Sequence, residues 1–260
     1  LVIRGMTVAS IIAFYLFFNE GLNFVKKLFQ IDGVTIIGGM SLTTAFLGFI
    51  YSISYTTAAV TLFMLALMPF LASLIAFIFL KEKISKQNFV SMVVAFIGTL
   101  VMIYASAFSG SFFGLIMGFI SSLGFAAFSV ALRSKSDIKK FYILIYGGLF
   151  CALFSAFLMI INNQDFYIPI KNVYLSMTHG TLVASGLILF SIGSKQLLSG
   201  ELTMLSLLEV VGGIFWAWLP ILGINEVPSI NTIIGGAIIC VAIAMNSYRF
   251  DKKRLQNLTR

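Results

Sequence analysis

The sequence has 260 residues, of which 60% are hydrophobic and only 10% are charged, and its mean hydropathy is +1.04. A chain this poor in polar residues has too little polar surface to cover a water-soluble globule of its length. The net charge of +8 does not point to a nucleic-acid partner, because the Lys and Arg residues are spread over short joints between apolar stretches. Composition therefore excludes a soluble domain and indicates an integral membrane protein.

Nine apolar stretches are long enough to cross a hydrocarbon layer about 30 Å thick as helices. They are too long and too evenly apolar for strands, and they lack the alternating pattern of an outer-membrane barrel. We therefore predict an all-α fold, a polytopic membrane helix bundle. The predicted spans cover residues 2–20, 34–54, 57–80, 88–107, 112–132, 141–161, 173–195, 202–222 and 229–248.

The basic residues predict the orientation of these spans. If the chain crosses the membrane once per span, 15 of its 17 Lys and Arg residues fall on the side that holds the C-terminal tail. Only Arg4 and Lys171 lie elsewhere. Since basic loops stay in the cytoplasm, we expect a multi-pass protein of the bacterial cytoplasmic (inner) membrane with a cytoplasmic C-terminus and an external first residue.

An internal repeat relates the two halves of the chain. A shift of 144 residues places Glu82 on Glu226 and Ser85 on Ser229, and a shift of 141 aligns the preceding helices. The joint around Glu82 is predicted inside and the joint around Glu226 outside, so the two copies are inverted. We expect a first repeat at 1–108 with four spans, a second at 109–250 with five, and a basic cytoplasmic tail at 251–260.

Inverted repeats need an odd number of spans in each copy, so we expect the intact protein to carry one further N-terminal helix, ten helices in all. Two inverted copies have two nearly equivalent packings, because each copy can take the conformation of the other. Exchanging the two packings opens a central site first to one side of the membrane and then to the other. This alternating access predicts a transporter of a small-molecule substrate, surrounded by membrane lipids and with a homodimer left open.

Paired motifs in the two halves resemble the EamA family of the drug/metabolite transporter superfamily. They are Tyr55-Thr56-Thr57-Ala58-Ala59, Leu67-Met68-Pro69 and Lys81-Glu82-Lys83-Ile84-Ser85, echoed by Leu207-Leu208-Glu209 and Asn225-Glu226-Val227-Pro228-Ser229. The resemblance implies a ten-helix carrier of small organic metabolites, amino acids or related compounds among them, with export as the expected direction. The chain departs from the family pattern in lacking the first helix and in reading Glu209-Val210 where a Glu-Pro pair is usual.

Two charged residues inside spans are the main site candidates. A carboxylate at the depth of Glu209 costs about 2.5–3.5 kcal/mol on insertion scales, so this side chain should face the bundle interior and bind a proton or a cationic group. Arg4 lies in the outer part of the first span, where a guanidinium can clamp a carboxylate or phosphate. The structural alternatives are a carboxylate hydrogen-bonded to a neighbouring helix and an arginine that reaches for the interface.

Five further residues are candidates with strong structural alternatives. Thr44 and Tyr51 are seven residues apart on one helix face, and Ser185 is the repeat image of Thr44. Together they form a polar stripe suited to an uncharged part of a metabolite, or ordinary contacts between helices. His179 is the only histidine and can relay protons near neutral pH, or simply bond at the interface. Trp216 can line a pocket wall.

Enzyme chemistry is not expected. The sequence has no phosphate-binding glycine loop with its lysine, and one histidine cannot build a metal centre or a Ser-His-Asp triad, so no catalytic residue, metal or cofactor is predicted. Two alternatives stay open. A lipid-linked or nucleotide-sugar carrier predicts several basic residues inside the cavity. A membrane-embedded transferase predicts intramembrane His, Asp or Glu clusters.

Overall fold

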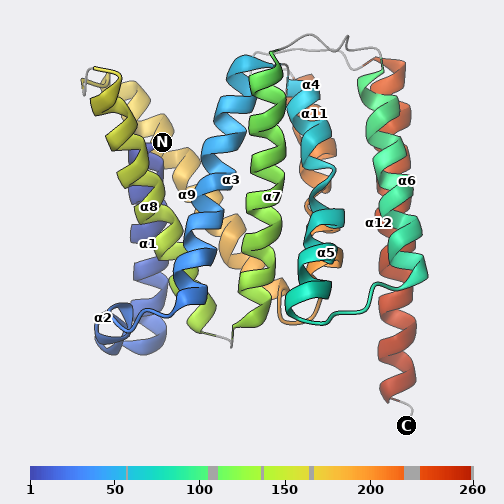
Figure 1. The fold of residues 1–260 in the computed structure, drawn as a ribbon, viewed down its shortest axis with the longest axis horizontal. Coiled ribbons are helices and arrows are strands. Elements are labelled where there is room, and N and C mark those ends of the chain that lie inside the picture. The colour runs from blue at the N-terminus through green and yellow to red at the C-terminus, as the bar shows by residue number, and fades with distance from the viewer. Residues whose placement is uncertain (57, 105–110, 136–137, 164–166, 220–228, 259–260) are drawn as a thin grey trace. The chain divides into compact units, whose positions relative to one another are not determined.

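The computed structural model describes the chain except residues 57, 105–110, 136–137, 164–166, 220–228 and 259–260, and its described part contains helices but no strand (Figure 1). The helices are α1 (Val2–Glu20), α2 (Asn23–Leu28), α3 (Gly33–Tyr55), α4 (Ala58–Leu65), α5 (Met68–Phe79), α6 (Lys86–Ile103), α7 (Phe112–Ser134), α8 (Lys139–Ile161), α9 (Ile170–Gly193), α10 (Ser199–Leu205), α11 (Leu208–Trp218) and α12 (Ile230–Leu258). The predicted all-α class is confirmed.

Seven segments of the described chain are long and apolar enough to cross a membrane as helices. They correspond to the predicted spans at 2–20, 34–54, 57–80, 112–132, 141–161, 173–195 and 229–248. The described part of the span predicted at 88–107 is a shorter apolar helix, Lys86–Met102. The chain is therefore a multi-pass membrane protein.

Two predicted spans are wrong as single helices. The stretch at 57–80 divides into α4 and α5, with a turn at Ala66 and Leu67 just before Pro69. Proline lacks an N–H donor and clashes with the preceding turn, so it ends the helix there. The stretch at 202–222 divides into α10 and α11 at Ser206 and Leu207, without a proline. The interruptions occupy nearly equivalent positions in the two predicted repeats.

The chain forms two compact units, and the division falls within α3 and α7. Unit 1 comprises residues 1–47 and 127–197, and unit 2 comprises 48–126 and 198–260. Each unit therefore takes segments from both halves of the sequence. The predicted boundary at 108/109 separates two stretches of similar sequence, whereas the two units are defined by contacts in space. The boundary therefore stays a prediction.

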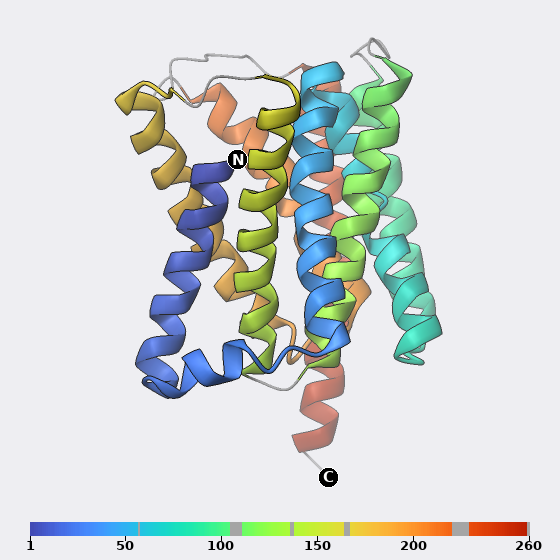
Figure 2. The same cartoon turned by 60° about the vertical axis from the view of Figure 1, so that its left-hand side comes forward.

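In unit 1, α1 lies beside α8 (Figure 2). The two helices approach most closely at a pair of glycines. A Cβ atom on Gly5 would lie 2.6 Å from the carbonyl oxygen of Gly148, and one on Gly148 would lie 2.7 Å from the carbonyl oxygen of Gly5. At the far end of α1, Glu20 accepts a hydrogen bond from Tyr142 near the start of α8, so the two helices are antiparallel. Only glycine permits this backbone contact, which is the way membrane helices pack closely.

Unit 2 contains a second crossing of the same kind, between α6 and α12. A Cβ atom on Gly98 would lie 2.9 Å from the carbonyl oxygen of Gly235, and one on Gly235 would lie even closer to the carbonyl oxygen of Gly98. Gln87, at the start of α6, donates to the carbonyl oxygen of Met245, far along α12, so this pair is antiparallel too. Met102 and Ile239, one from each helix of this pair, are buried and belong to the hydrophobic core of the unit.

These crossings pair helices that the sequence repeat equates, α1 with α8 and α6 with α12. The equivalence extends to the helix starts, because Ser85 caps α6 by accepting the N–H of Asn88 and Ser229 caps α12 by accepting the N–H of Thr232. In a protein with inverted repeats, a helix of one repeat and the matching helix of the other run in opposite directions. The two glycine crossings have this arrangement.

We expect Gly148→Ala to destabilise the protein by about 1–3 kcal/mol, because its methyl group would overlap the backbone of α1. Gly186→Ala is the matched control, since it lies on α9 of the same unit with nothing within 4 Å of its Cβ position. There, the better helix propensity of alanine should stabilise by up to about 1 kcal/mol. Apparent unfolding temperatures in detergent measure both, and a drop no larger for Gly148→Ala than for the control contradicts the crossing.

Candidate functional site

Arg4 is a buried charge in the first turn of α1. Its side chain is only 6% exposed, and the Nε and Nη2 atoms are buried without a hydrogen-bond partner. The guanidinium lies over the ring of Phe46 on α3, 4.4 Å from its centroid, and beside Cys151 on α8. Because Gly5 is at the α1–α8 crossing, the close approach of these helices encloses the preceding residue.

No described carboxylate of unit 1 reaches this guanidinium. The acidic residues described in unit 1 are Glu20 and Asp32, and both are engaged at the opposite end of α1 or beyond it. Glu20 pairs with Lys27 and Tyr142, whereas Asp32 pairs with Lys135 and accepts hydrogen bonds from Thr35. A contact with an aromatic face stabilises a cation only partly when the cation has lost its water.

His179 lies close to Arg4 on the neighbouring helix α9. The next residue, Gly180, packs directly on α1, with its Cβ position 3.1 Å from the carbonyl oxygen of Arg4. His179 is exposed and near enough to Arg4 for their charges to interact. The hydroxyls of Thr178 and Thr181 bond to carbonyl oxygens of their own helix. The structure thus brings together two of the predicted candidates, a guanidinium and an imidazole.

The predicted polar stripe is less well supported by contacts. Thr44 donates to the carbonyl oxygen of Met40 at 2.8 Å, and Ser185 donates to that of Thr181 at 2.9 Å. Such bonds back to the preceding turn are the usual way that a hydroxyl is satisfied within a helix. Tyr51 stacks on Tyr55 with ring centroids 6.4 Å apart. A substrate-binding role for Thr44, Tyr51 and Ser185 stays a prediction.

Glu209 follows directly after an interrupted helix in unit 2. It is the second residue of α11, its side chain is exposed, and its N–H bonds to the carbonyl oxygen of Ser206 at 2.9 Å. The first turn of a helix carries partial positive charge, which favours a carboxylate there. Trp216 also belongs to α11, but its side chain lies outside the described residues. The same holds for Glu226 and its joint.

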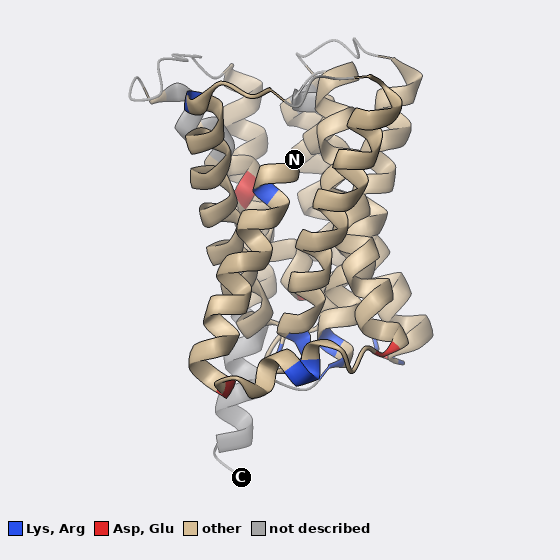
Figure 3. Ribbon diagram, turned by 90° about the vertical axis from the view of Figure 1, so that its left-hand side faces the viewer, with Lys and Arg blue, Asp and Glu red and all other residues tan. Residues whose placement is uncertain are grey.

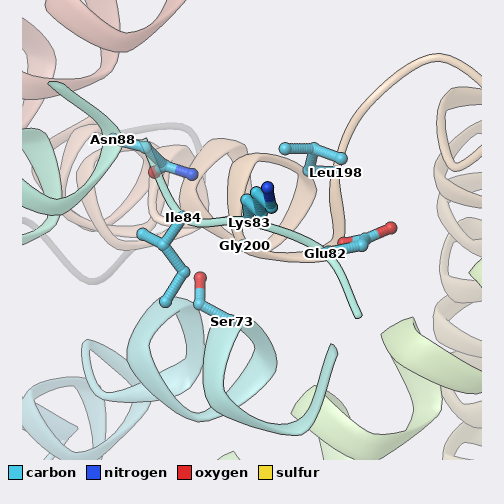
Figure 4. A pocket seen from close by; sticks show the side chains of 7 residues that line it. All are labelled: Ser73, Glu82, Lys83, Ile84, Asn88, Leu198 and Gly200. Atoms are coloured by element: carbon cyan, nitrogen blue, oxygen red, sulfur yellow. The ribbon is translucent and has the colours of Figure 1, made fainter. Parts of the chain in front are cut away.

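A small pocket in unit 2 lies where α10 begins (Figure 4). Glu82 accepts the N–H of Ser199 at 3.2 Å, and Glu201 accepts the N–H of Leu198 at 3.1 Å, so two carboxylates cap this helix. In the sequence, Glu82 was notable only as the repeat image of Glu226, and no pattern indicated its contact with a distant helix. The lining residues are Ser73, Glu82, Lys83, Ile84, Asn88, Leu198 and Gly200.

Most basic residues of unit 1 lie at one end, where α1 stops and α8 starts (Figure 3). There Arg133 donates to the carbonyl oxygens of Ser194 and Lys195, at the C-terminal end of α9. Buried Lys140 donates to the hydroxyl of Ser194 at 3.1 Å. Cations favour the negative end of a helix dipole, so these residues fix the helix ends in addition to any role in orientation.

Comparisons with known proteins extend this picture. The model of the EamA-like transporter family matches residues 1–104. Two curated relatives, both named pseudopaline exporter CntI and from two strains of Pseudomonas aeruginosa, are each 26% identical over 200 residues, which is 75% of this chain and 67% of theirs. One solved structure, described only as the crystal structure of a protein, matches 96% of this chain and 87% of its own with a TM-score of 0.71 at 16% identity. That likeness shows the fold.

The contact between α5 and α10 gives a test of the pocket. A Cβ atom on Gly200 would lie 1.9 Å from the Ser73 hydroxyl oxygen. We expect Gly200→Ala to lower the apparent unfolding temperature by the equivalent of about 1–3 kcal/mol, whereas Ser73→Ala alone changes it little. Adding Ser73→Ala to Gly200→Ala should recover part of the loss, because it removes the obstructing atom. Strict additivity of the two changes in detergent would disprove this packing.

Proposed function

Since residues 1–104 belong to the EamA-like transporter family, we propose that this protein is a secondary transporter that exports a small organic metabolite across the bacterial cytoplasmic membrane by alternating access. The chain is a membrane transporter and not an enzyme. Export is supported by the two relatives, each named as an exporter of pseudopaline. The distribution of Lys and Arg supports a cytoplasmic C-terminus.

The reciprocal glycine crossings carry the proposal of alternating access. α1 with α8, and α6 with α12, are counterparts in the two repeats, and each pair contacts antiparallel at matching glycines. If each repeat can adopt the conformation of the other, these contacts can persist while the flanking helices exchange arrangements. The carrier then has two states of similar energy, one open to each side.

The interrupted helices support a site within the membrane. In secondary transporters, substrate and coupling ions are commonly bound where half-helices meet near the bilayer midplane. Here Glu209 begins the second half of one such helix, and a carboxylate facing hydrocarbon would be costly. We assign to Glu209 the binding of a proton or a cationic substrate group in a water-accessible cavity. Its exchange of a proton for substrate would couple export to the proton gradient.

We also propose substrate contacts for Arg4, Thr44 and Ser185 of unit 1 and for Tyr51 and Trp216 of unit 2, with His179 of unit 1 as a second proton carrier. A lipid-linked or nucleotide-sugar carrier is the second candidate. Its phosphate groups call for several cations within the membrane, but the described spans carry their basic residues near their ends, and Arg4 itself lies in the first turn of α1. This distribution favours a metabolite with little negative charge.

Transport by the full-length protein in proteoliposomes tests the proposal. Vesicles would be offered a panel of radiolabelled amino acids and related metabolites with and without an imposed pH gradient. We expect at least one compound to accumulate in protein-containing vesicles above protein-free vesicles. If the panel, extended to nucleotide sugars, shows movement of nucleotide sugars alone, the metabolite proposal is wrong and the second candidate is favoured.

Glu209→Gln should abolish accumulation driven by the pH gradient while leaving substrate exchange at equal pH, because glutamine cannot take up a proton. Glu201→Gln is the matched control in the same unit, since glutamine can replace glutamate in capping α10. Initial rates of uptake and of exchange separate the two effects. Unchanged gradient-driven uptake by Glu209→Gln would remove the coupling role from this residue.

A further inference from the structure

The guanidinium of Arg4 presents an unoccupied hydrogen-bonding edge. Of its three nitrogens, the two that are buried without a partner are Nε and Nη2. The Nε hydrogen and one Nη2 hydrogen lie in the guanidinium plane, project in parallel from the same edge and form a fork. A carboxylate with two parallel oxygens fits such a fork through two charge-assisted hydrogen bonds.

The neighbours of Arg4 leave the Nε–Nη2 edge of its guanidinium open to a hydrogen-bond acceptor. Phe46 covers a face of the guanidinium, with its ring centroid 4.4 Å away, and the thiol beside it, Cys151, is a weak acceptor. An uncharged thiol and an aromatic face do not replace the water that the cation lost on burial. A buried, incompletely bonded charge is costly, and such groups are retained where they bind something.

From this geometry, and resting on the proposed transport function, we propose that Arg4 binds a carboxylate group of the transported metabolite through the Nε–Nη2 edge. In the conformation described here both atoms are closed off from solvent. The carboxylate therefore reaches them in a state in which helices around α1 have moved apart, and its binding energy helps to select that state.

Charge favours a carboxylate over a phosphate at this position. One guanidinium balances one carboxylate charge, whereas a phosphate monoester carries about −1.5 to −2 at neutral pH. Two further groups that can be cationic lie near Arg4: the exposed imidazole of His179 and the amino group of Leu1. The other described Lys and Arg residues of unit 1 lie in joints, in α2 or at the ends of α7, α8 and α9.

Binding to the full-length protein in detergent tests the proposal independently of transport. The probes are N-acetyl-L-leucine and N-acetyl-L-phenylalanine, each compared with its uncharged carboxamide, and inorganic phosphate. A ligand that binds the folded state raises the apparent unfolding temperature with concentration, which gives its dissociation constant. We expect at least one acid to stabilise the protein while its amide does not, and phosphate to have no effect at equal concentration.

Arg4→Gln should weaken binding of that acid about 30-fold or more, the usual effect of removing one partner of a buried charge pair. The affinity of Arg4→Lys for the acid should lie between those of the native protein and Arg4→Gln, because lysine keeps the charge but loses the fork. Lys171→Gln is the control, since it removes one charge from an exposed position in the same unit. Without ligand, Arg4→Gln should be at least as stable as the native protein, a result that a purely structural arginine would not give.

Several outcomes would overturn the proposal: amides that stabilise as well as acids, no acid that stabilises, stabilisation by phosphate alone, or acid binding that survives in Arg4→Gln. If binding is specific for the acid and depends on Arg4 but vesicles show no transport, the proposed function is contradicted and the carboxylate site is still supported. If transport is equally fast in Arg4→Gln, the carboxylate site is contradicted and the proposed transport function is still supported.

Discussion

Close contact between glycine backbones holds this helical protein together. Lipid tails are as apolar as leucine, so membrane helices gain little from the hydrophobic effect and rely on packing. Gly5 with Gly148, and Gly98 with Gly235, bring helix backbones to a separation that no side chain would allow. The same contact that joins α1 to α8 also encloses Arg4, one residue before Gly5, and so couples the packing of unit 1 to its most unusual charge.

The helical class was accessible from the sequence because it rests on many residues at once. Long apolar runs have one solution in a bilayer, whereas the repeat stays a prediction that the matching caps at Ser85 and Ser229 support. The interruptions at Ala66 and Ser206 were missed, since apolar residues continue through both turns. Pro69 was a signal for the first interruption, but the second has no such residue and depends on tertiary packing.

The candidate site was predicted in part. Arg4 and Glu209 stood out because a charge within an apolar span needs a reason, and the structure places Arg4 in a closed environment. Its neighbours Phe46 and Cys151 carried no signal, as apolar residues within apolar helices. The capping of α10 by Glu82 joins residues 117 positions apart, and periodicity cannot reveal such a contact. The hydroxyls of Thr44 and Ser185 bond within their own helices, so these contacts leave their predicted role as a prediction.

The central claim is that the two halves of the chain have opposite orientations in the membrane. Single cysteines at Lys83 and Ser229, in a protein with Cys151 and Cys240 replaced by serine, can be labelled in intact cells and in inverted vesicles with a membrane-impermeant maleimide. The account predicts that position 83 reacts only from the cytoplasmic side and position 229 only from the outside. Reaction of both positions from one compartment would contradict the inverted repeat and, with it, the mechanism of alternating access.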